Sequence, residues 1–411
     1  MSATPALSAR ETPGLRILFL APQPFFEVRG TPLAVLAMVR ALVAAGHHVE
    51  LLTFAQGADV DVPGLDHRRS LRLPVGHVRP GASLAKLLLD VPFMAQAAWR
   101  MLAGRFDVVH AVEEAAHLAA PHGRVLGRPL VVDVDSSIPD QLRESGFARR
   151  GPLPWAAAAL ERYALRHAAA VITVCTSLTE GVRARAPGAA VFQVEDPPLV
   201  DATAPAADEV AGLRAALRLD ARPVVLYSGN FEEYQGVGLL VDAAARAAEA
   251  QFVFMGGEPS EIEAARARAQ AAGAGDRCVF AGKRPPTELP RFLALADVVA
   301  SPRRRGVNTP FKVYTYLASG RPLLATRIVS HTQILDDTNA WLVDPTPAAL
   351  AAGIRAALHD PSEAARRAAR GRALVEREYS PARYAQKVRA AYAHVVAAAG
   401  PQRRRAASIQ R

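Results

Sequence analysis

Residues 303–322 read Arg303-Arg304-Arg305-Gly306-Val307-Asn308-Thr309-Pro310-Phe311-Lys312-Val313-Tyr314-Thr315-Tyr316-Leu317-Ala318-Ser319-Gly320-Arg321-Pro322. The pattern predicts a strand end, a basic loop, a helix and a Gly-x-Pro exit into another strand. Thr309 is suited to cap the helix, Pro310 to its first position, and Gly320 to a left-handed stop. Lys312 would then lie in the first turn, where anions and not cations are favoured. A phosphate-like anion bound between the helix N-terminus and Lys312 would account for both features.

On both sides of this stretch, short apolar runs alternate with segments of helical spacing. Such alternation is typical of parallel sheets with right-handed crossovers. The chain has 411 residues, more than one compact core usually holds, so we expect two α/β domains. Strands are predicted at residues 16–21, 48–54, 106–112, 129–134, 170–175, 190–195, 223–228, 251–255, 278–281, 297–300, 322–326 and 340–343.

The boundary between the domains is expected where the texture changes, at Asp196-Pro197-Pro198 and the aperiodic Pro/Ala/Asp segment that follows. Residues 1–196 would form the first domain and residues 197–380 the second. A last helix is predicted at residues 381–399, followed by a basic, disordered tail at 400–411. That tail is either solvated or, through Arg403-Arg404-Arg405, in contact with anionic lipid.

The net charge of +10 and the isoelectric point of about 10.1 indicate anionic partners. Arg is scattered along the chain and forms no stripe with interleaved aromatic residues. This distribution argues against nucleic acid and favours phosphate-bearing small molecules or an anionic membrane surface.

Several features of the sequence indicate a cytoplasmic protein. Cys175 and Cys278 lie in apolar runs and are expected to be buried thiols in a reducing compartment. Residues 1–14 lack the apolar core of a signal peptide, so export is not indicated. Charged residues interrupt each long apolar stretch, so no membrane-spanning helix is expected. Residues 82–102 have an amphipathic pattern, which suits a helix packed on its own sheet or one lying on a membrane. Packing on the sheet is the preferred interpretation.

Polar residues follow several predicted strands. Glu113 comes after the strand at 106–112, and Asp135 after the strand at 129–134. In open α/β folds this edge of the sheet faces the ligand crevice, so both carboxylates either contact substrate or only cap helices. In the long loop at 24–32, Gly30-Thr31 stands at the helix entry, where the backbone could approach a ligand. A plain helix start without a ligand is the alternative.

Further motifs stand in a fixed order along the chain. They are the strand with its Gly30 loop, Tyr227-Ser228-Gly229-Asn230-Phe231…Gln235-Gly236-Val237, Phe254-Met255-Gly256-Gly257, Phe280-Ala281-Gly282, Leu295-Ala296-Asp297-Val298-Val299-Ala300-Ser301-Pro302 and Tyr316-Leu317-Ala318-Ser319-Gly320-Arg321-Pro322. In order and spacing, the chain resembles the GT-B glycosyltransferases, and more specifically the retaining, nucleotide-sugar-dependent enzymes of family 4 (group 1).

The resemblance implies two Rossmann-like domains facing a cleft. The C-terminal domain would hold a UDP- or GDP-sugar, the N-terminal domain a sugar, glycan or lipid-linked acceptor, and the helix at 381–399 would pack back on the first domain. No metal or cofactor would be obligatory, because a helix N-terminus and basic side chains stabilise the leaving diphosphate. Domain closure would exclude water from the donor. Peripheral contact with the inner face of a membrane is compatible with these expectations.

Three departures from the family pattern stand out. The usual Gly-Arg…Lys-Gly turn reads Gly229-Asn230…Gln235-Gly236, without its two positive charges. The usual pair of Glu residues falls on Val307 and Thr315. The usual His-x-His-Glu reads His110-Ala111-Val112-Glu113.

Two interpretations follow from these departures. In an active, divergent enzyme, basic residues among Lys312, Lys283, Arg284 and Arg303 to Arg305 restore the positive charge; alternatively, the chain is an inactive GT-B scaffold that serves as a binding subunit. A sugar-nucleotide epimerase is a lesser alternative, and Lys283 and Arg284 could also be solvated surface residues. The active interpretation assigns catalytic roles to Lys312, Glu113 and Asp135, and donor binding to Gly30, Thr31, Gly229, Asn230, Phe231, Gln235, Lys283, Arg284, Asn308, Thr309, Pro310 and Thr315.

Overall fold

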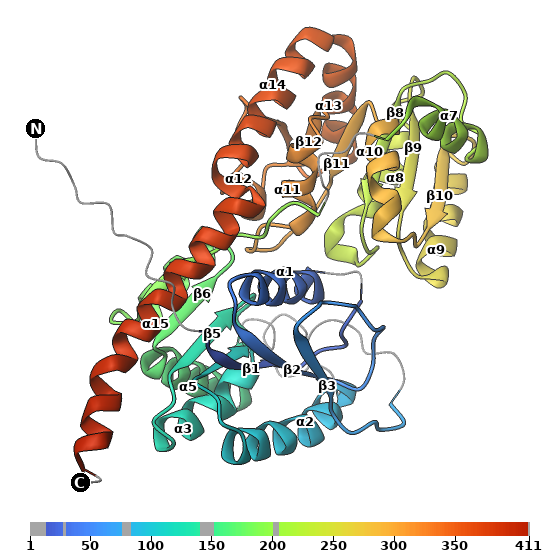
Figure 1. Ribbon diagram of the computed structural model, residues 1–411. Helices are drawn as coiled ribbons and strands as arrows, with labels where there is room; N and C mark the ends of the chain where they lie inside the picture. Colours follow the sequence, from blue (N-terminus) through green and yellow to red (C-terminus); the bar gives the residue numbers. More distant parts are fainter. Residues whose placement is uncertain (1–13, 28–29, 76–83, 140–151, 200–204, 410–411) are drawn as a thin grey trace, which may run out of the picture.

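The chain folds around two parallel sheets that lie end to end, as the computed structural model in Figure 1 shows. The structure describes residues 14–27, 30–75, 84–139, 152–199 and 205–409. The expectations for residues 1–13 therefore lie outside the described residues. The prediction of an α/β protein with two Rossmann-like sheets is confirmed.

The first sheet has seven parallel strands in the order β3-β2-β1-β4-β5-β6-β7. Most of these strands are buried on both faces, which is why they read as continuous apolar runs in the sequence. The edge strand β3 was not predicted, because its alternating polar sequence Leu65-Asp66-His67-Arg68-Arg69 lacks such a run. The strands are β1 (Arg16–Ala21), β2 (His48–Thr53), β3 (Leu65–Arg69), β4 (Val108–Val112), β5 (Leu130–Val134), β6 (Ala170–Thr173) and β7 (Val191–Gln193).

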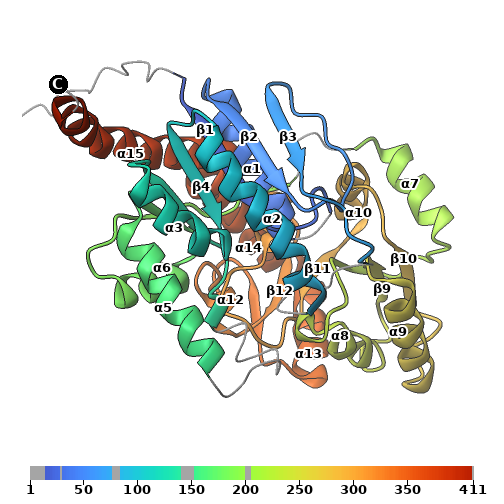
Figure 2. The same cartoon turned by 90° about the horizontal axis from the view of Figure 1, so that it is seen from below.

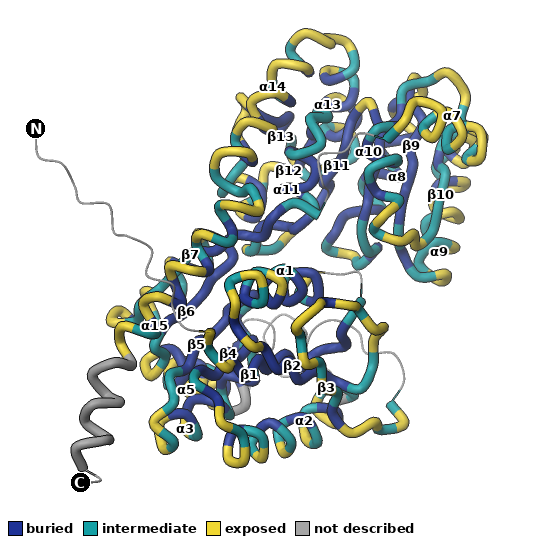
Figure 3. The backbone as a smooth tube through the Cα atoms, in the orientation of Figure 1, coloured by how far each residue is buried: buried dark blue, intermediate teal, exposed yellow. Residues whose placement is uncertain are grey.

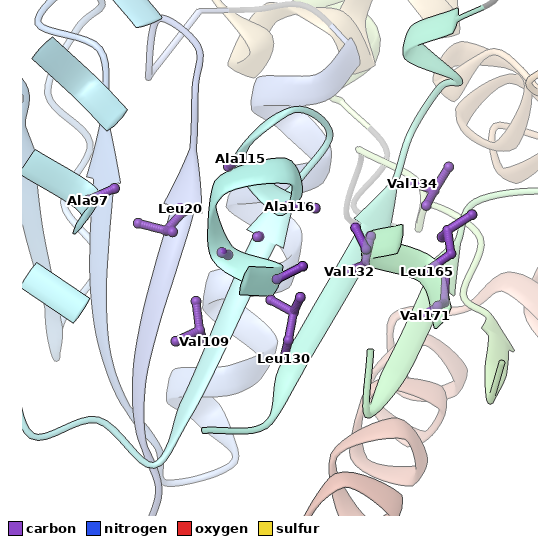
Figure 4. Packing of buried hydrophobic residues seen from close by; sticks show 14 of the residues in the cluster. Leu20, Ala97, Val109, Ala115, Ala116, Leu130, Val132, Val134, Leu165 and Val171 are labelled. Atoms are coloured by element: carbon purple, nitrogen blue, oxygen red, sulfur yellow. The ribbon is translucent and has the colours of Figure 1, made fainter. Parts of the chain in front are cut away.

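Helices cover both faces of this sheet. One face packs against α1 (Gly30–Ala44) and α15 (Pro381–Ile409), and the other against α2 (Leu84–Ala103), α3 (Ala115–Val125), α5 (Pro152–His167) and α6 (Thr176–Arg185) (Figure 2). The apolar stripe of α2, Leu89, Phe93, Ala97 and Met101, is fully buried, so the preferred packing of this helix on its own domain is confirmed. Figure 4 shows how Ala115 and Ala116 of α3 pack on Val109, Leu130 and Val132 of the sheet.

The second sheet has six parallel strands in the order β10-β9-β8-β11-β12-β13. These strands lie within a few residues of their predicted positions. They are β8 (Val224–Ser228), β9 (Gln251–Met255), β10 (Cys278–Gly282), β11 (Val298–Ser301), β12 (Leu323–Thr326) and β13 (Trp341–Val343).

Helices also cover both faces of the second sheet, and the inner strands of both sheets are buried (Figure 3). One face packs against α8 (Val237–Ala244), α9 (Pro259–Ala271), α13 (Pro347–His359) and α14 (Pro361–Leu374). The other packs against α7 (Ala207–Ala216), α10 (Leu289–Leu295) and α11 (Phe311–Ala318), and the short helix α12 (Val329–Thr332) follows β12.

The long helix α15 leaves the second domain and runs along the first (Figure 1). Its residues Tyr384, Val388, Ala391, Tyr392 and Val395 are buried in the same cluster as strands β1 and β5. The hydroxyl of Tyr392 lies 2.8 Å from Nδ1 of the buried His110. These contacts support a helix that packs back on the first domain, while the division at 196/197 stays a prediction.

Helix α15 continues to Ile409, so the expected disordered tail from residue 400 is wrong up to that residue. The physical reason is composition, because Ala and Arg are among the best helix formers. The buried positions of Cys175 and Cys278 confirm the prediction for both thiols. None of the helices in the described part of the chain has the length and apolar character needed to span a bilayer.

Candidate active site

The two sheets present their topological switch points to each other. Strand order reverses between β1 and β4 in the first sheet and between β8 and β11 in the second. Ligands of open α/β sheets bind beyond the carboxyl ends of the strands at such points. A cavity of about 1200 Å³ lies there and is lined by residues of both domains.

Fourteen of the fifteen residues expected at the site line this cavity. The exception is Phe231, whose ring packs against Tyr227, Phe254 and Phe280 in the core of the second domain. The residues that line it are Gly30, Thr31, Glu113, Asp135, Gly229, Asn230, Gln235, Lys283, Arg284, Asn308, Thr309, Pro310, Lys312 and Thr315. Their individual roles stay predictions.

Lys312 lies in the first turn of α11 and lines the cavity. Its Nζ donates a hydrogen bond to Oε1 of Gln235 at 3.2 Å and stands 4.0 Å from the centre of the Tyr227 ring. Burial lowers the pKa of Lys312 well below its ordinary value, and the Arg303 guanidinium lowers it further. Among the described residues the ammonium has a hydrogen bond and a ring face but no carboxylate partner, so an anionic ligand would supply its counter-charge.

The helix start differs by one residue from the prediction. Thr309 does not cap α11; Pro310 takes the N-cap position, because its extended backbone (ψ 132°) cannot belong to the first helical turn. Gly320 adopts φ 68°, which confirms the left-handed stop. The N–H of Val313 donates to the carbonyl oxygen of Pro310, which leaves the N–H groups of Phe311 and Lys312 without intrahelical acceptors, and both residues line the cavity.

Two glycines let the backbone close around Lys312. A Cβ atom on Gly229 would stand 2.7 Å from Nζ of Lys312, and a Cβ atom on Gly256 would stand 2.0 Å from the carbonyl oxygen of Gly229. Both residues also have positive φ, 138° and 117°, which side chains disfavour. The backbone turns after β8 and β9 therefore need glycine in order to approach each other and the ammonium.

Arg303 fixes the loop that precedes α11. Its guanidinium donates hydrogen bonds to the carbonyl oxygen of Asn308 at 2.8 Å and to Oδ1 of Asn308 at 3.1 Å, and it stacks on Tyr234. Of the three consecutive arginines only Arg303 lines the cavity, whereas Arg304 pairs with Glu233 on the surface. Arg304 and Arg305 are exposed and do not line the cavity, so within the arginine run the expected charge at the cavity comes from Arg303.

Lys283 and Arg284 lie at the rim of the cavity. Lys283 forms an exposed ion pair with Glu258, and Arg284 donates a hydrogen bond to the carbonyl oxygen of Ala281. Their charge is therefore partly matched by protein groups and by solvent, so they contribute less at the site than the buried Lys312 does.

The two positions that correspond to the family's Glu pair have different surroundings. Val307 is exposed, and its carbonyl oxygen accepts a hydrogen bond from Gln333. Thr315 is buried, and its hydroxyl accepts a hydrogen bond from the Leu199 N–H at 3.1 Å, which joins the linker to α11. Neither residue brings a negative charge to the donor side of the cavity.

The side of the cavity that belongs to the first domain is acidic. Glu113 follows β4 in a left-handed conformation (φ 49°) that is strained for a non-glycine residue, and its carboxylate accepts a hydrogen bond from Ser136. Asp135 follows β5 and accepts a hydrogen bond from Thr31. Burial raises the pKa of both carboxyl groups, and for Asp135 the charges of Asp133 and Glu113 raise it further.

Sequence reasoning missed several residues that line the cavity. Asp196 follows the strand β7 just as Glu113 and Asp135 follow theirs, so the same strand-end rule could have found it. Its place at the predicted domain boundary, directly before Pro197-Pro198, concealed this signal. Lys86 of α2 also lines the cavity, and no sequence pattern marks it, because a lysine on an amphipathic helix is usually solvated.

Two family profiles cover most of the chain. The family described as Glycosyl transferases group 1 matches residues 222–360, and the one described as Glycosyl transferase 4-like domain matches residues 29–194. The alpha-D-kanosaminyltransferase of Streptomyces kanamyceticus is 29% identical over 269 residues, which are 62% of this chain and 68% of that protein. The GDP-mannose-dependent alpha-(1-6)-phosphatidylinositol monomannoside mannosyltransferase of Mycolicibacterium smegmatis is 30% identical over 234 residues, 54% of this chain and 60% of the relative.

Solved structures share the architecture over nearly the whole chain. Sucrose-phosphate synthase from Thermosynechococcus elongatus superposes with a TM-score of 0.77 at 22% identity, covering 93% of this chain and 100% of the other. HepE of Anabaena, solved in complex with UDP-glucose, superposes with a TM-score of 0.73 at 18% identity, covering 92% and 99%. These likenesses show the fold, which is the two-domain GT-B arrangement.

Proposed function

The chain belongs to the group 1 glycosyltransferases, which use nucleotide-sugar donors, and from this premise we propose that it transfers the sugar with retention and without a metal. The diphosphate of the donor binds between the N-terminus of α11 and Lys312. The sugar extends toward the carboxylates of the first domain, where the acceptor binds. Gly30, Thr31, Gly229, Asn230, Gln235, Asn308 and Thr309 complete the donor site.

The observation that carries this proposal is Lys312, a buried ammonium at a helix N-terminus to which no carboxylate of the described part of the chain is paired. As the bond to the sugar breaks, negative charge grows on the leaving diphosphate. Fixed N–H groups and a buried ammonium stabilise that charge at the moment it develops, which is the role that a metal ion has in other transferases. Water is excluded because the site lies between two domains that can close.

The proposed activity predicts consumption of one donor from a panel of UDP-, GDP-, ADP- and dTDP-sugars. The purified protein should release nucleoside diphosphate and free sugar slowly without an acceptor, because water replaces the acceptor in an incompletely closed cleft. Product formation is followed by chromatography in the presence of EDTA. Retention is tested by the configuration of the anomeric carbon in the product.

An altered sugar in the product without transfer would identify an epimerase. Binding of a donor without turnover, under all acceptors and conditions tried, would identify the inactive scaffold. Either result contradicts the proposed transfer.

We also propose that an anionic membrane surface covers part of the first domain. Leu87, Leu88, Val91, Trp99 and Leu102 on α2 are exposed, as are Val125 on α3 and Trp155 on α5. These neighbouring helices also carry the exposed basic residues Arg124, Arg162 and Arg166. Apolar side chains beside positive charges favour the interface of a bilayer with anionic headgroups.

Sedimentation with phosphatidylglycerol vesicles should recover the protein, and pure phosphatidylcholine vesicles should recover much less. The double variant Leu88→Ser and Trp99→Ser should weaken the binding by roughly tenfold or more, since apolar area no longer enters the interface. Val329→Ser, which removes an exposed apolar residue of α12, serves as the control. Equal recovery of the double variant and the wild type would contradict membrane contact through this surface.

A further inference from the structure

Asp196 is a buried carboxylate that lines the cavity. It is only 8% exposed, and no hydrogen bond or ion pair reaches its carboxylate within the part of the chain that the structure describes. Burial raises the pKa of Asp196 to about 8, and the charges of Asp133 and Glu195 add to the effect. A buried carboxylate without a partner is costly, so the position gains most from a ligand that brings a donor or a positive charge.

Carboxylates of β5, two strands away from β7 in the sheet, act on Asp196. Asp133 lies within β5, and Asp135 follows its last residue. Both carboxylates make the electrostatic potential at this edge of the sheet more negative. Oδ2 of Asp133 lies 3.2 Å from Nε2 of His110, while its Oδ1 is buried without a hydrogen bond. Protein groups therefore satisfy this cluster only in part.

Lys86, which lines the cavity on the side of the first domain, does not neutralise the cluster. Nζ of Lys86 forms an ion pair with Oε1 of Glu114 at 2.5 Å. Burial alone would lower the pKa of Lys86, but Glu114 and Glu113 raise it above its ordinary value. Its charge is thus matched by neighbouring glutamates, and Asp135 and Asp196 remain an acidic surface opposite the basic donor side.

We propose that Asp196, together with Asp135, binds an ammonium group of the acceptor, so that the acceptor is an amine-bearing sugar or cyclitol. A metal ion is a poorer occupant, because no three His, Cys, Asp or Glu side chains among the described residues come together as a set that could hold one. An ammonium needs only two or three acceptor oxygens, which a pair of carboxylates supplies. The ammonium is held for recognition, and a hydroxyl of the same acceptor receives the sugar.

This inference rests on the proposed function and adds the class of the acceptor to it. The cleft would then have two opposite electrostatic halves. The anionic diphosphate binds at Lys312, and the cationic acceptor binds at Asp196. The electrostatic complementarity of each half excludes the wrong ligand from that half, so donor and acceptor enter in one orientation.

The test uses three probes that differ at one position, D-glucosamine, N-acetyl-D-glucosamine and D-glucose. Binding to the protein saturated with its nucleoside diphosphate is measured by ligand-observed NMR titration. Glucosamine should bind at least about tenfold more tightly than the two neutral probes, because only its amine is charged. In Asp196→Asn this preference should disappear, while the affinity for the neutral probes should change little.

Two matched variants sharpen the result. Asp135→Asn should reduce the preference for glucosamine in part, and Asp208→Asn, which changes an exposed aspartate of α7, should leave it unchanged. Melting temperatures of all variants identify any that fail to fold, and in that case Asp135→Asn decides the outcome.

Equal affinity for the three probes, a preference that survives in Asp196→Asn, or no binding of glucosamine would overturn the proposal. None of these outcomes contradicts the proposed transferase activity if the protein consumes a nucleotide sugar from the donor panel. Absence of donor turnover together with a clear preference for glucosamine would instead overturn the proposed function alone.

Discussion

Lys312→Ala is expected to weaken the binding of a nucleoside diphosphate by roughly 1.5–3 kcal/mol, about 10- to 150-fold in Kd, which is the range for a hydrogen bond to a charged group. The substitution removes the ammonium that lies beside Gln235 and the Tyr227 ring. Sugar release from the donor should fall by at least the same factor, because the charge on the leaving diphosphate grows in the transition state. Calorimetric titration and an assay of donor hydrolysis measure the two effects.

Lys283→Ala is the matched control for this variant. Lys283 also lines the cavity, but it is exposed and already paired with Glu258. Its removal should change diphosphate affinity by roughly 1 kcal/mol or less, as is usual for exposed ion pairs. Equal losses in the two variants would mean that the diphosphate binds at the rim and not at the N-terminus of α11.

The calorimetric titration of the diphosphate should also detect the uptake of a proton on binding. The pKa of Lys312 lies well below its ordinary value in the free protein, because of burial first and Arg303 second. A bound diphosphate favours the charged amine and raises that pKa. Binding should therefore take up a proton, and affinity should fall as the pH rises from the pKa of the free protein to that of the complex. Titrations in buffers of different ionisation enthalpy detect this uptake, which Lys312→Ala should abolish.

Gly256→Ala is expected to destabilise the second domain by about 2–6 kcal/mol. The new Cβ would stand 2.0 Å from the carbonyl oxygen of Gly229, and the backbone would keep a φ of 117° that alanine disfavours. Strain at a disfavoured φ costs on the order of 1–3 kcal/mol, and relief of the overlap costs about 1–3 kcal/mol more. Because the shift would move Gly229 against Lys312, diphosphate binding should weaken as well.

Gly273→Ala separates backbone strain from overlap. Gly273 also has positive φ, 71°, but a Cβ there would meet no atom within 4 Å. Gly273→Ala should lower the free energy of unfolding by about 1 kcal/mol, the usual effect of an alanine in a left-handed conformation. Chemical denaturation measures both variants, and similar losses of stability would show that the contact between Gly256 and Gly229 contributes nothing.

Much of the fold could be predicted because parallel strands that are buried on both faces appear in the sequence as continuous apolar runs. The runs that became β1, β5 and β9 are examples. The helices α3 and α6 escaped prediction, since α3 contains Pro121 and Gly123, and α6 begins with the polar run Thr176-Ser177. Local sequence weakly favours a helix in both, and it is packing on the first sheet that stabilises them.

Much less of the site could be predicted. The strand-end rule located Glu113 and Asp135, and the helix start located Lys312. The environment of Lys312 could not be read from the sequence, because Gln235 lies 77 residues away and Tyr227 is brought to it by the neighbouring strand. The absence of a carboxylate beside this lysine is a property of the folded chain. Asp196 was overlooked for a similar reason, since only the folded chain brings the segment after β7 close to Asp133 on β5, which lies two strands away in the sheet.

The central claim is that a diphosphate binds at Lys312 and the N-terminus of α11 without a metal. Calorimetric titration of UDP, GDP and ADP into the wild-type protein in the presence of EDTA tests it most directly. One of the three should bind with a Kd on the order of micromolar, about −8 kcal/mol, with uptake of a proton. No binding of any of the three, or binding that appears only when a divalent cation is added, would contradict it.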